Sequence, residues 1–150
     1  EEIKNFIKNS ISNIASSMNT TINVEIRESE ENYNVMLISE NNPILIGKDG
    51  KTLNSIQLLI HQAINNVSGF NIRVNIDVAG YKANREKRLE SQVKRIAKEV
   101  LNTKIEAKLD PMNSYDRRLV HNVVGKFKNL ESLSYGEEPL RYIVISYKED

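Results

Sequence analysis

The sequence of 150 residues contains no cysteine and no tryptophan. Without cysteine, disulfide bonds, thiolate metal sites and cysteine nucleophiles are excluded. A chain without cysteine also fits a reducing cytoplasm better than an oxidising compartment, so we expect a cytoplasmic protein. Without tryptophan, only the six tyrosines and three phenylalanines are available for aromatic stacking.

Long apolar runs are missing as well. No segment approaches the roughly 20 apolar residues that a membrane-spanning helix needs, and no basic stretch precedes an apolar signal core. We therefore expect no insertion into a membrane. The chain begins with Glu1, directly in a helical pattern, rather than with methionine. We therefore expect it to be part of a longer protein.

The chain has little net charge, formally +1, but its charges are unevenly distributed. Residues 80–128 carry 13 Lys and Arg against 6 Asp and Glu, a net charge of +7, whereas residues 1–40 carry 3 against 7. A long solvated helix with its cations facing outward would explain the basic segment. A surface that contacts phosphates without regard to sequence explains it equally well.

The first half of the chain shows helical and strand patterns in alternation. Apolar residues at three- and four-residue steps predict helices, and strict alternation with polar residues predicts strands. The expected elements are a helix over 2–18, strands over 22–26 and 33–38 joined by a polar turn at 28–32, a short helix over 43–46 and a turn over 47–50. A second long helix and a strand over 70–78 follow. The side chains of that helix that we expect to face inward are Leu53, Ile56, Leu59, Ile60, Ala63, Ile64 and Val67.

Gly80 separates this half from a second unit, so we place a domain boundary between residues 79 and 80. A basic helix over 81–101 opens the second unit, with a buried stripe at Leu89, Val93, Ile96 and Val100. Asn113 is a predicted N-cap, with Asp116 in the first turn of the helix that follows. The other expected elements are a short strand over 104–109, a helix over 114–127 and strands over 130–134 and 140–147.

Two glycines bracket Lys48 and Asp49 between the two predicted helices of the first half. A Gly-x-x-Gly turn can be purely structural, because glycine adopts positive φ at low cost. Here the turn also lacks Cβ atoms beside a helix N-terminus, and Lys48 and Lys51 flank it. That combination favours phosphate binding. The spacing excludes a Walker phosphate loop and a dinucleotide fingerprint.

In the second half, the segment 111–121 places Arg117 and His121 one helical turn apart, so both side chains project from one helix face. Both can donate hydrogen bonds to a phosphate or stack on a base. A solvated arginine and a half-buried histidine would fit the same spacing. The candidate nucleic-acid contacts of this half are Arg85, Arg88, Arg117, Arg118, His121 and Arg141. Candidate stacking residues are Tyr81, Tyr115 and Tyr142, for which structural packing is the alternative.

The turn and the order of elements around it resemble the type II KH domain. This resemblance implies that Gly47, Lys48, Asp49 and Gly50 clamp the backbone of a single strand, beside an apolar groove for bases at Leu45, Ile46 and Ile56. Simple core packing is the alternative for these three side chains. Asp49 departs from the family, which often has a basic residue in the variable pair, and an acid should weaken phosphate attraction.

The Arg-x-x-x-His segment, together with the downstream sequence TyrGlyGluGluPro and Arg141, resembles the R-three-H domain that binds single-stranded nucleic acid. The tandem of both domains resembles the Jag family of bacterial RNA-binding proteins, also called KhpB, over essentially the whole chain. This implies an α+β fold with two small α/β-sandwich-like domains: a type II KH domain (1–79, order α-β-β-α-α-β) and an R-three-H domain (80–150) with a short three-stranded sheet.

The resemblance also implies a cytoplasmic protein that binds single-stranded RNA, with single-stranded DNA as the alternative ligand. It further implies pairing with a smaller KH-only protein, self-association, and a regulatory role in cell elongation, division or sporulation. No cofactor, metal or enzymatic activity is expected.

Two other functions remain open. A nuclease would have to use Arg117 and His121, although no acidic pair stands beside either histidine. An adaptor that mainly binds protein is favoured by Asp49 and the acidic first 40 residues.

Overall fold

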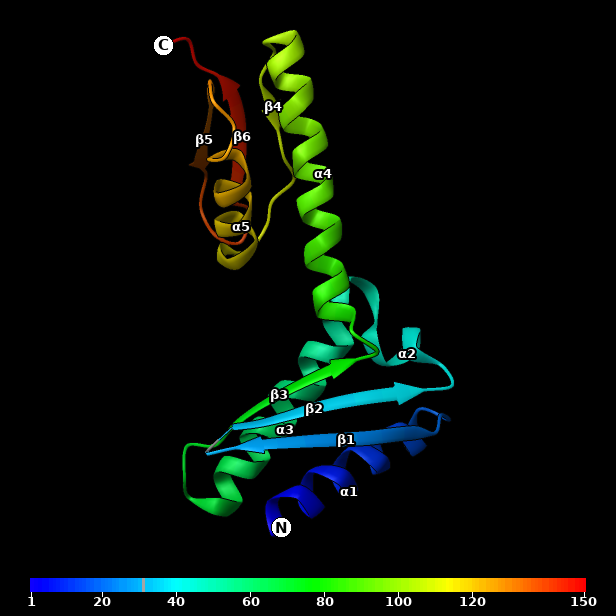
Figure 1. Cartoon of the computed structure of the whole chain (residues 1–150). Coiled ribbons are helices and arrows are strands. Elements are labelled where there is room, and N and C mark those ends of the chain that lie inside the picture. Colours follow the sequence, from blue (N-terminus) through cyan, green and yellow to red (C-terminus); the bar gives the residue numbers. More distant parts are fainter. Residues whose placement is uncertain (31) are drawn as a thin grey trace. The chain divides into compact units, whose positions relative to one another are not determined.

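The computed structural model describes residues 1–30 and 32–150 and divides the chain into two compact units, Glu1–Ala83 and Asn84–Asp150. The predicted α+β fold with two small layered units is confirmed (Figure 1). The elements of the first unit are α1 (Glu2–Ser17), β1 (Ile22–Ser29), β2 (Asn32–Ser39), α2 (Asn42–Ile46), a 3-10 turn (Lys48–Gly50), α3 (Lys51–Ser68) and β3 (Arg73–Val78). The expected turn at 28–32 includes residue 31, which lies outside the described residues.

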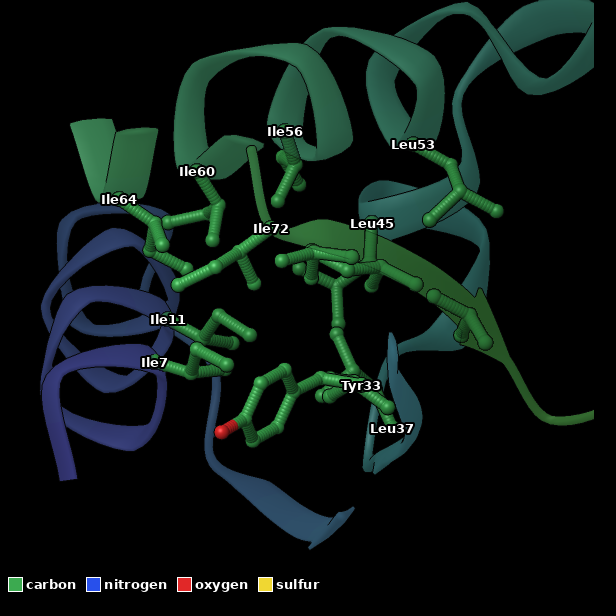
Figure 2. Close-up of a cluster of buried hydrophobic side chains, with 14 residues drawn as sticks. Ile7, Ile11, Tyr33, Leu37, Leu45, Leu53, Ile56, Ile60, Ile64 and Ile72 are labelled. Atoms are coloured by element: carbon green, nitrogen blue, oxygen red, sulfur yellow. The ribbon is translucent and has the colours of Figure 1, made fainter. Parts of the chain in front are cut away.

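The first unit is a three-stranded sheet with helices packed on one face. The strand order is β1-β2-β3, with β1 antiparallel and β3 parallel to β2. Tyr33, Leu37 and Ile76 point to one face of this sheet and are buried. Figure 2 shows Ile7 and Ile11 of α1 and the isoleucines of α3 in the same cluster of buried side chains. The alternation along the strands therefore assigns one face to the core.

Helix α3 buries a narrower stripe than its sequence predicts. Leu53, Ile56, Ile60 and Ile64 are buried, as expected. Leu59 and Val67, which we predicted to face inward, are 58% and 74% exposed, so those two assignments are wrong. The sheet is narrow and is shared with α1, so only the residues at three- and four-residue steps along one line of α3 can reach it.

Two side chains of α3 form hydrogen bonds with backbone groups of β3 and of the residue before it. The Gln57 side-chain oxygen accepts the Ile76 N–H at 2.9 Å. The Asn65 side chain binds the backbone just before β3 in the same way. Its Oδ1 accepts the Ile72 N–H at 2.7 Å, and its Nδ2 donates to the carbonyls of His61 and Ile72 at 2.8 and 3.2 Å. The regular part of the strand begins at Arg73, later than the predicted start at residue 70.

The second unit repeats the layered plan with different connections. Its elements are α4 (Tyr81–Thr103, whose first three residues belong to the first unit), β4 (Ala107–Lys108), α5 (Ser114–Val124), β5 (Leu130–Tyr135) and β6 (Tyr142–Tyr147). The strand order is β4-β6-β5, and all neighbours are antiparallel. Val93 and Val100 of α4 and Val120 of α5 pack on Ile143 and Ile145 of β6. The expected strand over 104–109 is reduced to two residues.

The buried stripe of α4 differs slightly from the predicted one. Val93 and Val100 are buried as expected, but Leu89 and Ile96 are only partly buried, and Ala97 is buried in addition. Within the described residues, no helix is long and apolar enough to cross a membrane.

The amide of Asn65 provides a test of this fold. Replacement Asn65→Ala should lower the free energy of unfolding by about 1–2 kcal/mol, because the groups of Ile72 lose hydrogen-bond partners in a partly buried place. The neighbour Asn66 is exposed and serves as the control, and Asn66→Ala should change stability by less than about 0.5 kcal/mol. Urea denaturation followed by circular dichroism measures both. Equal effects of the two replacements would show that the hydrogen bonds of Asn65 to the Ile72 backbone do not stabilise the fold.

Candidate nucleic-acid interface

The Gly-x-x-Gly turn lies between α2 and α3, as predicted. The Gly47 N–H donates to the Pro43 carbonyl at 2.9 Å and ends α2, and the Gly50 N–H donates to the Gly47 carbonyl at 3.3 Å. Leu45 before the turn and Leu53 after it are both 1% exposed and belong to the same core cluster. The turn is therefore held at both ends by buried leucines.

Both glycines of the turn are required by its geometry. Gly47 has φ +73°, and a Cβ built there would lie 2.1 Å from Thr52 Oγ1. Gly50 has φ +76°, and a Cβ would lie 2.9 Å from the Tyr81 ring. A left-handed backbone and a close neighbour each disfavour any side chain, so both positions select glycine.

Asp49 also has a left-handed backbone, with φ 55° and ψ 27°. Aspartate and asparagine tolerate this region better than most other residues that carry a Cβ. The backbone thus gives a conformational reason for an acid at a position where the family often has a basic residue. Its carboxylate is exposed and adds negative charge to the turn.

The surroundings of the turn favour an anion. Lys48 and Lys51 are exposed, and neither forms an ion pair within the described part of the chain. Gly50 is the N-cap of α3 and has no side chain to accept hydrogen bonds from the first helical turn, in which the Lys51 N–H already donates to the Lys48 carbonyl. A phosphate at this helix N-terminus would meet the N–H groups that follow Lys51 and the field of two lysines.

The apolar groove that the family resemblance implied is occupied by the core. Leu45 and Ile56 are buried at 1% and 6% exposure, and Ile46 is packed against the same cluster. Core packing, the alternative given for these residues, accounts for them. Tyr81 is likewise packed against the core, beside Gly50. Lys82 donates to the Gln57 oxygen at 2.8 Å, and burial lowers the pKa of its ammonium.

In the second unit, Arg117 is fixed by two contacts. Its guanidinium donates to the Met112 carbonyl at 2.6 Å and to a carboxylate oxygen of Glu138 at 2.6 Å, and its side chain is 11% exposed. One of its hydrogen-bonding edges is therefore used to join α5 to the loop 136–141. The carboxylate of Glu138 is itself 59% exposed and occupies a place where a phosphate oxygen could lie.

His121 and Arg141 are positioned by two serines of β5. His121 Nδ1 is 2.7 Å from Ser132 Oγ, and Arg141 Nε donates to Ser134 Oγ at 2.7 Å. Ser132 and Ser134 are two residues apart on one strand and so lie on the same face. The structure therefore brings the two predicted contacts to neighbouring positions along β5.

Arg85 has a structural partner. Its guanidinium forms a bidentate ion pair with Asp116, with N–O distances of 2.9 and 2.7 Å. The Asp116 side chain is 4% exposed, and its backbone N–H is capped by Asn113 Oδ1 at 2.9 Å. The predicted N-cap is thus observed, and Arg85 ties α4 to the first turn of α5.

Other cations remain on the surface. Arg88 lies on α4 with Lys87 and Arg95, which together line a shallow surface groove with Ser91 and Gln92. Arg118 is exposed on α5, near Glu90 and Lys126. These arginines present positive charge to solvent rather than to a buried carboxylate.

Tyr115, a stacking candidate, takes part in a hydrogen bond between two helices. Its hydroxyl donates to a carboxylate oxygen of Glu86 at 2.6 Å, and this carboxylate raises the pKa of Tyr115. The ring is nevertheless 63% exposed. The hydrogen bond therefore orients a ring that solvent can still reach.

Several contributing residues were not predicted from the sequence. Ser132, Ser134 and Glu138 position the arginines and the histidine, but serines in a strand and a glutamate in a turn give no distinctive pattern. His61, the other histidine, is half-buried beside Asn65 in the first unit. Within the described residues, no group of three or more His, Asp or Glu side chains could hold a metal ion.

Comparisons with known proteins match both units. Residues 4–76 match the family model described as KhpA/KhpB, KH domain, and residues 87–147 match the model of the R-three-H domain. RNA-binding protein KhpB of Clostridium symbiosum is 40% identical over 136 residues, which are 91% of this chain and 61% of the relative. RNA-binding protein KhpB of Bacillus subtilis is 31% identical over 137 residues, covering 90% of this chain and 66% of the relative. The chain thus spans about three fifths to two thirds of these relatives' length.

Arg85 and Arg88 of α4 allow the effect of a charge in an ion pair to be compared with that of a charge on the surface. Replacement Arg85→Ala should lower the free energy of unfolding by about 1–3 kcal/mol, because the buried Asp116 carboxylate loses two charged hydrogen bonds. Solvent can reach Arg85 in part, which keeps the loss below that of a fully buried pair. Replacement Arg88→Ala should stay within about 0.5 kcal/mol of the wild type. Thermal and urea unfolding would measure both, and an Arg85→Ala variant as stable as the wild type would refute the structural role.

Proposed function

This chain belongs to the KhpB family, and from that membership we propose that it binds single-stranded RNA at two places. The first is the Gly47–Gly50 turn with Lys48 and Lys51, and the second is the surface of the second unit that carries Arg117, Arg118, His121 and Arg141. The observation that carries the proposal is the turn itself: two glycines with positive φ lead into the N-terminus of α3, which has no side-chain cap, and Lys48 and Lys51 are exposed there and form no ion pair within the described residues.

Each contact has a separate task in this mechanism. The turn supplies backbone N–H groups and two ammonium groups to phosphates, which gives affinity without sequence preference. Arg141 and His121 supply planar groups that can donate to phosphate or stack on a base. Arg88 adds positive charge along α4. Arg85 stabilises the second unit through its ion pair with Asp116.

We also propose the finer features that the family suggests. The two matched segments support a KH domain over 1–79 and an R-three-H domain over 80–150 that includes the basic helix, although the two compact units divide a little later, after Ala83. The names of the relatives support binding rather than catalysis. Family membership supports a cytoplasmic location and a regulatory role in cell elongation, division or sporulation.

An adaptor function is the second candidate, and one observation favours it. Exposed apolar side chains gather on the first unit. Leu58, Leu59, Val67 and Phe70 are between 57% and 74% exposed, and Ile3 and Phe6 join the last two in a shallow apolar groove. Such a surface often contacts another protein. It supports pairing with a KH-only protein or with a second copy, and salt-insensitive self-association without RNA binding would favour the adaptor as the main function.

The salt dependence of RNA binding tests the proposed function. Labelled single-stranded RNA should bind the wild type with an affinity that falls steeply with salt. Lys48→Asp, and separately the double variant Arg117→Gln with His121→Asn, should each weaken binding and flatten the slope by about 0.7 for each phosphate interaction that is removed. Glutamine and asparagine keep some hydrogen bonding where Arg117 and His121 are held.

Two results would decide against this proposal. Absence of wild-type binding at low salt would remove RNA binding altogether. Wild-type affinity in both variants would show that neither place binds RNA. Circular dichroism of each variant is the necessary control, because a variant that unfolds reports only a structural effect. Recovery of cleaved RNA after incubation with divalent metal would instead support the nuclease alternative.

Asp49 offers a gain-of-binding test. Asp49→Asn keeps a residue that tolerates the left-handed backbone and removes a negative charge beside the proposed phosphate site. RNA affinity at low salt should rise about two- to fivefold, the size expected for one exposed charge. Asp49→Ala removes the same charge but should cost about 1 kcal/mol of stability, since alanine disfavours positive φ. Unchanged affinity in Asp49→Asn would show that the phosphate does not lie at this turn.

A further inference from the structure

One face of the β4-β6-β5 sheet is covered by α4 and α5, and the other face carries side chains of a different kind. Ile143 and Ile145 of β6 point into the core, so Tyr142 and Val144 between and beside them point to the opposite face. This second face is defined by the antiparallel register of the three strands.

The register places residues of β5 and β4 beside those of β6 on this face. Tyr135 is paired with Tyr142, and Leu133 with Val144. On the other side of β6, Lys108 is paired with Val144. Leu133 and Tyr135 are 44% and 46% exposed, so solvent reaches this face.

Two aromatic rings and an ammonium group lie next to one another on this face. The ring centroids of Tyr135 and Tyr142 are 6.1 Å apart, with an angle of 33° between the planes. Lys108 Nζ lies 4.4 Å from the centroid of the Tyr142 ring. An ammonium group, a half-buried ring and a more exposed ring thus follow one another across three strands. We call Lys108, Leu133, Tyr135 and Tyr142 the tyrosine face.

The chemistry of the tyrosine face matches an unpaired nucleotide. An exposed tyrosine ring offers a flat apolar surface on which any base can stack, and a neighbouring ammonium attracts the phosphate. Glu131, the acid of β5 on this face, is paired with Ser146, away from the end of the strand that carries Tyr135. The register therefore separates this acid from the paired rings, whereas Lys108 lies over one of them.

The position of β5 connects the tyrosine face to the cations already described. β5 is an edge strand of the sheet. Ser134 holds Arg141 on one side of this strand, and the next residue, Tyr135, presents its ring on the other. Gly136, with φ +84°, then turns the chain away from the strand. A single strand of RNA that crosses this edge can place a phosphate toward Arg141 while its bases reach the rings.

We propose that the tyrosine face is a base-stacking site for single-stranded RNA, in which Tyr135 stacks on an unpaired base beside Tyr142 and Lys108 contacts the adjoining phosphate. The inference rests on the proposed RNA binding and adds the element that contacts bases rather than backbone.

A single tryptophan introduced at this site reports stacking directly. Tyr135→Trp would be the only tryptophan in the chain, because the natural sequence has none. Its fluorescence should be quenched when a short oligoadenylate binds. An abasic oligomer with the same number of phosphates should bind through the cations but leave the fluorescence unchanged. Binding of both oligomers without quenching by either would overturn the proposal.

Affinity measurements on matched variants give a second, independent test. Tyr135→Thr removes the ring but keeps a residue suited to a strand, and should weaken oligoadenylate binding about 5- to 100-fold. Its salt slope should stay unchanged, because the phosphate interactions remain in place. Tyr135→Phe keeps the ring and should bind like the wild type. Lys108→Met should lower the slope by about 0.7.

The outcomes distinguish this inference from the proposed function. If Tyr135→Thr binds oligoadenylate like the wild type while Lys48→Asp weakens it, the base-stacking site falls and RNA binding stands. If Tyr135→Thr alters only self-association, the tyrosine face is a protein contact and the proposal is again overturned. If the wild type binds no RNA at low salt, both fall together.

Discussion

The first unit depends on a backbone constraint: Gly47, Asp49 and Gly50, in the turn between α2 and α3, all adopt positive φ. Leu45 and Leu53 are buried in one cluster on either side of this turn, so the backbone between them is confined to a small space. Glycine at both ends follows from this lack of space, and Asp49 follows from its left-handed conformation. The geometry of the turn and the packing of the core thus have one physical origin here.

The second unit shows why a count of basic residues is an incomplete description of a binding surface. Its arginines differ in what they contact: Arg85 satisfies a buried carboxylate, Arg117 joins a helix to a loop, and Arg88 faces solvent. Charges in buried pairs mainly stabilise and orient, because their attraction is already used within the protein. Exposed charges supply the long-range, salt-sensitive attraction.

Phosphate contacts and base contacts have different physical requirements, and we therefore propose different residues of this chain for each. Lys48, Lys51 and the N-terminus of α3 offer charge and N–H groups, which every nucleotide satisfies equally. Tyr135 and Tyr142 offer ring surface, which only an unpaired base can use. The two serines of β5, which hold His121 and Arg141, and the adjacent Tyr135 lie on one edge strand of the second unit, so the two proposed kinds of contact share that strand.

The sequence alone determined the order of elements, the Gly-x-x-Gly turn, the N-cap at Asn113 and the Arg-x-x-x-His spacing. All of these depend on residues close together in the chain, where periodicity, glycine and capping chemistry act locally. The tertiary structure decided that Leu59 and Val67 are exposed, that Arg85 pairs with Asp116, and that Ser132, Ser134, Lys108 and Tyr135 stand beside the predicted site residues. These facts depend on strand register and on how much of each helix a narrow sheet can cover, and both are set by contacts between segments far apart in the chain.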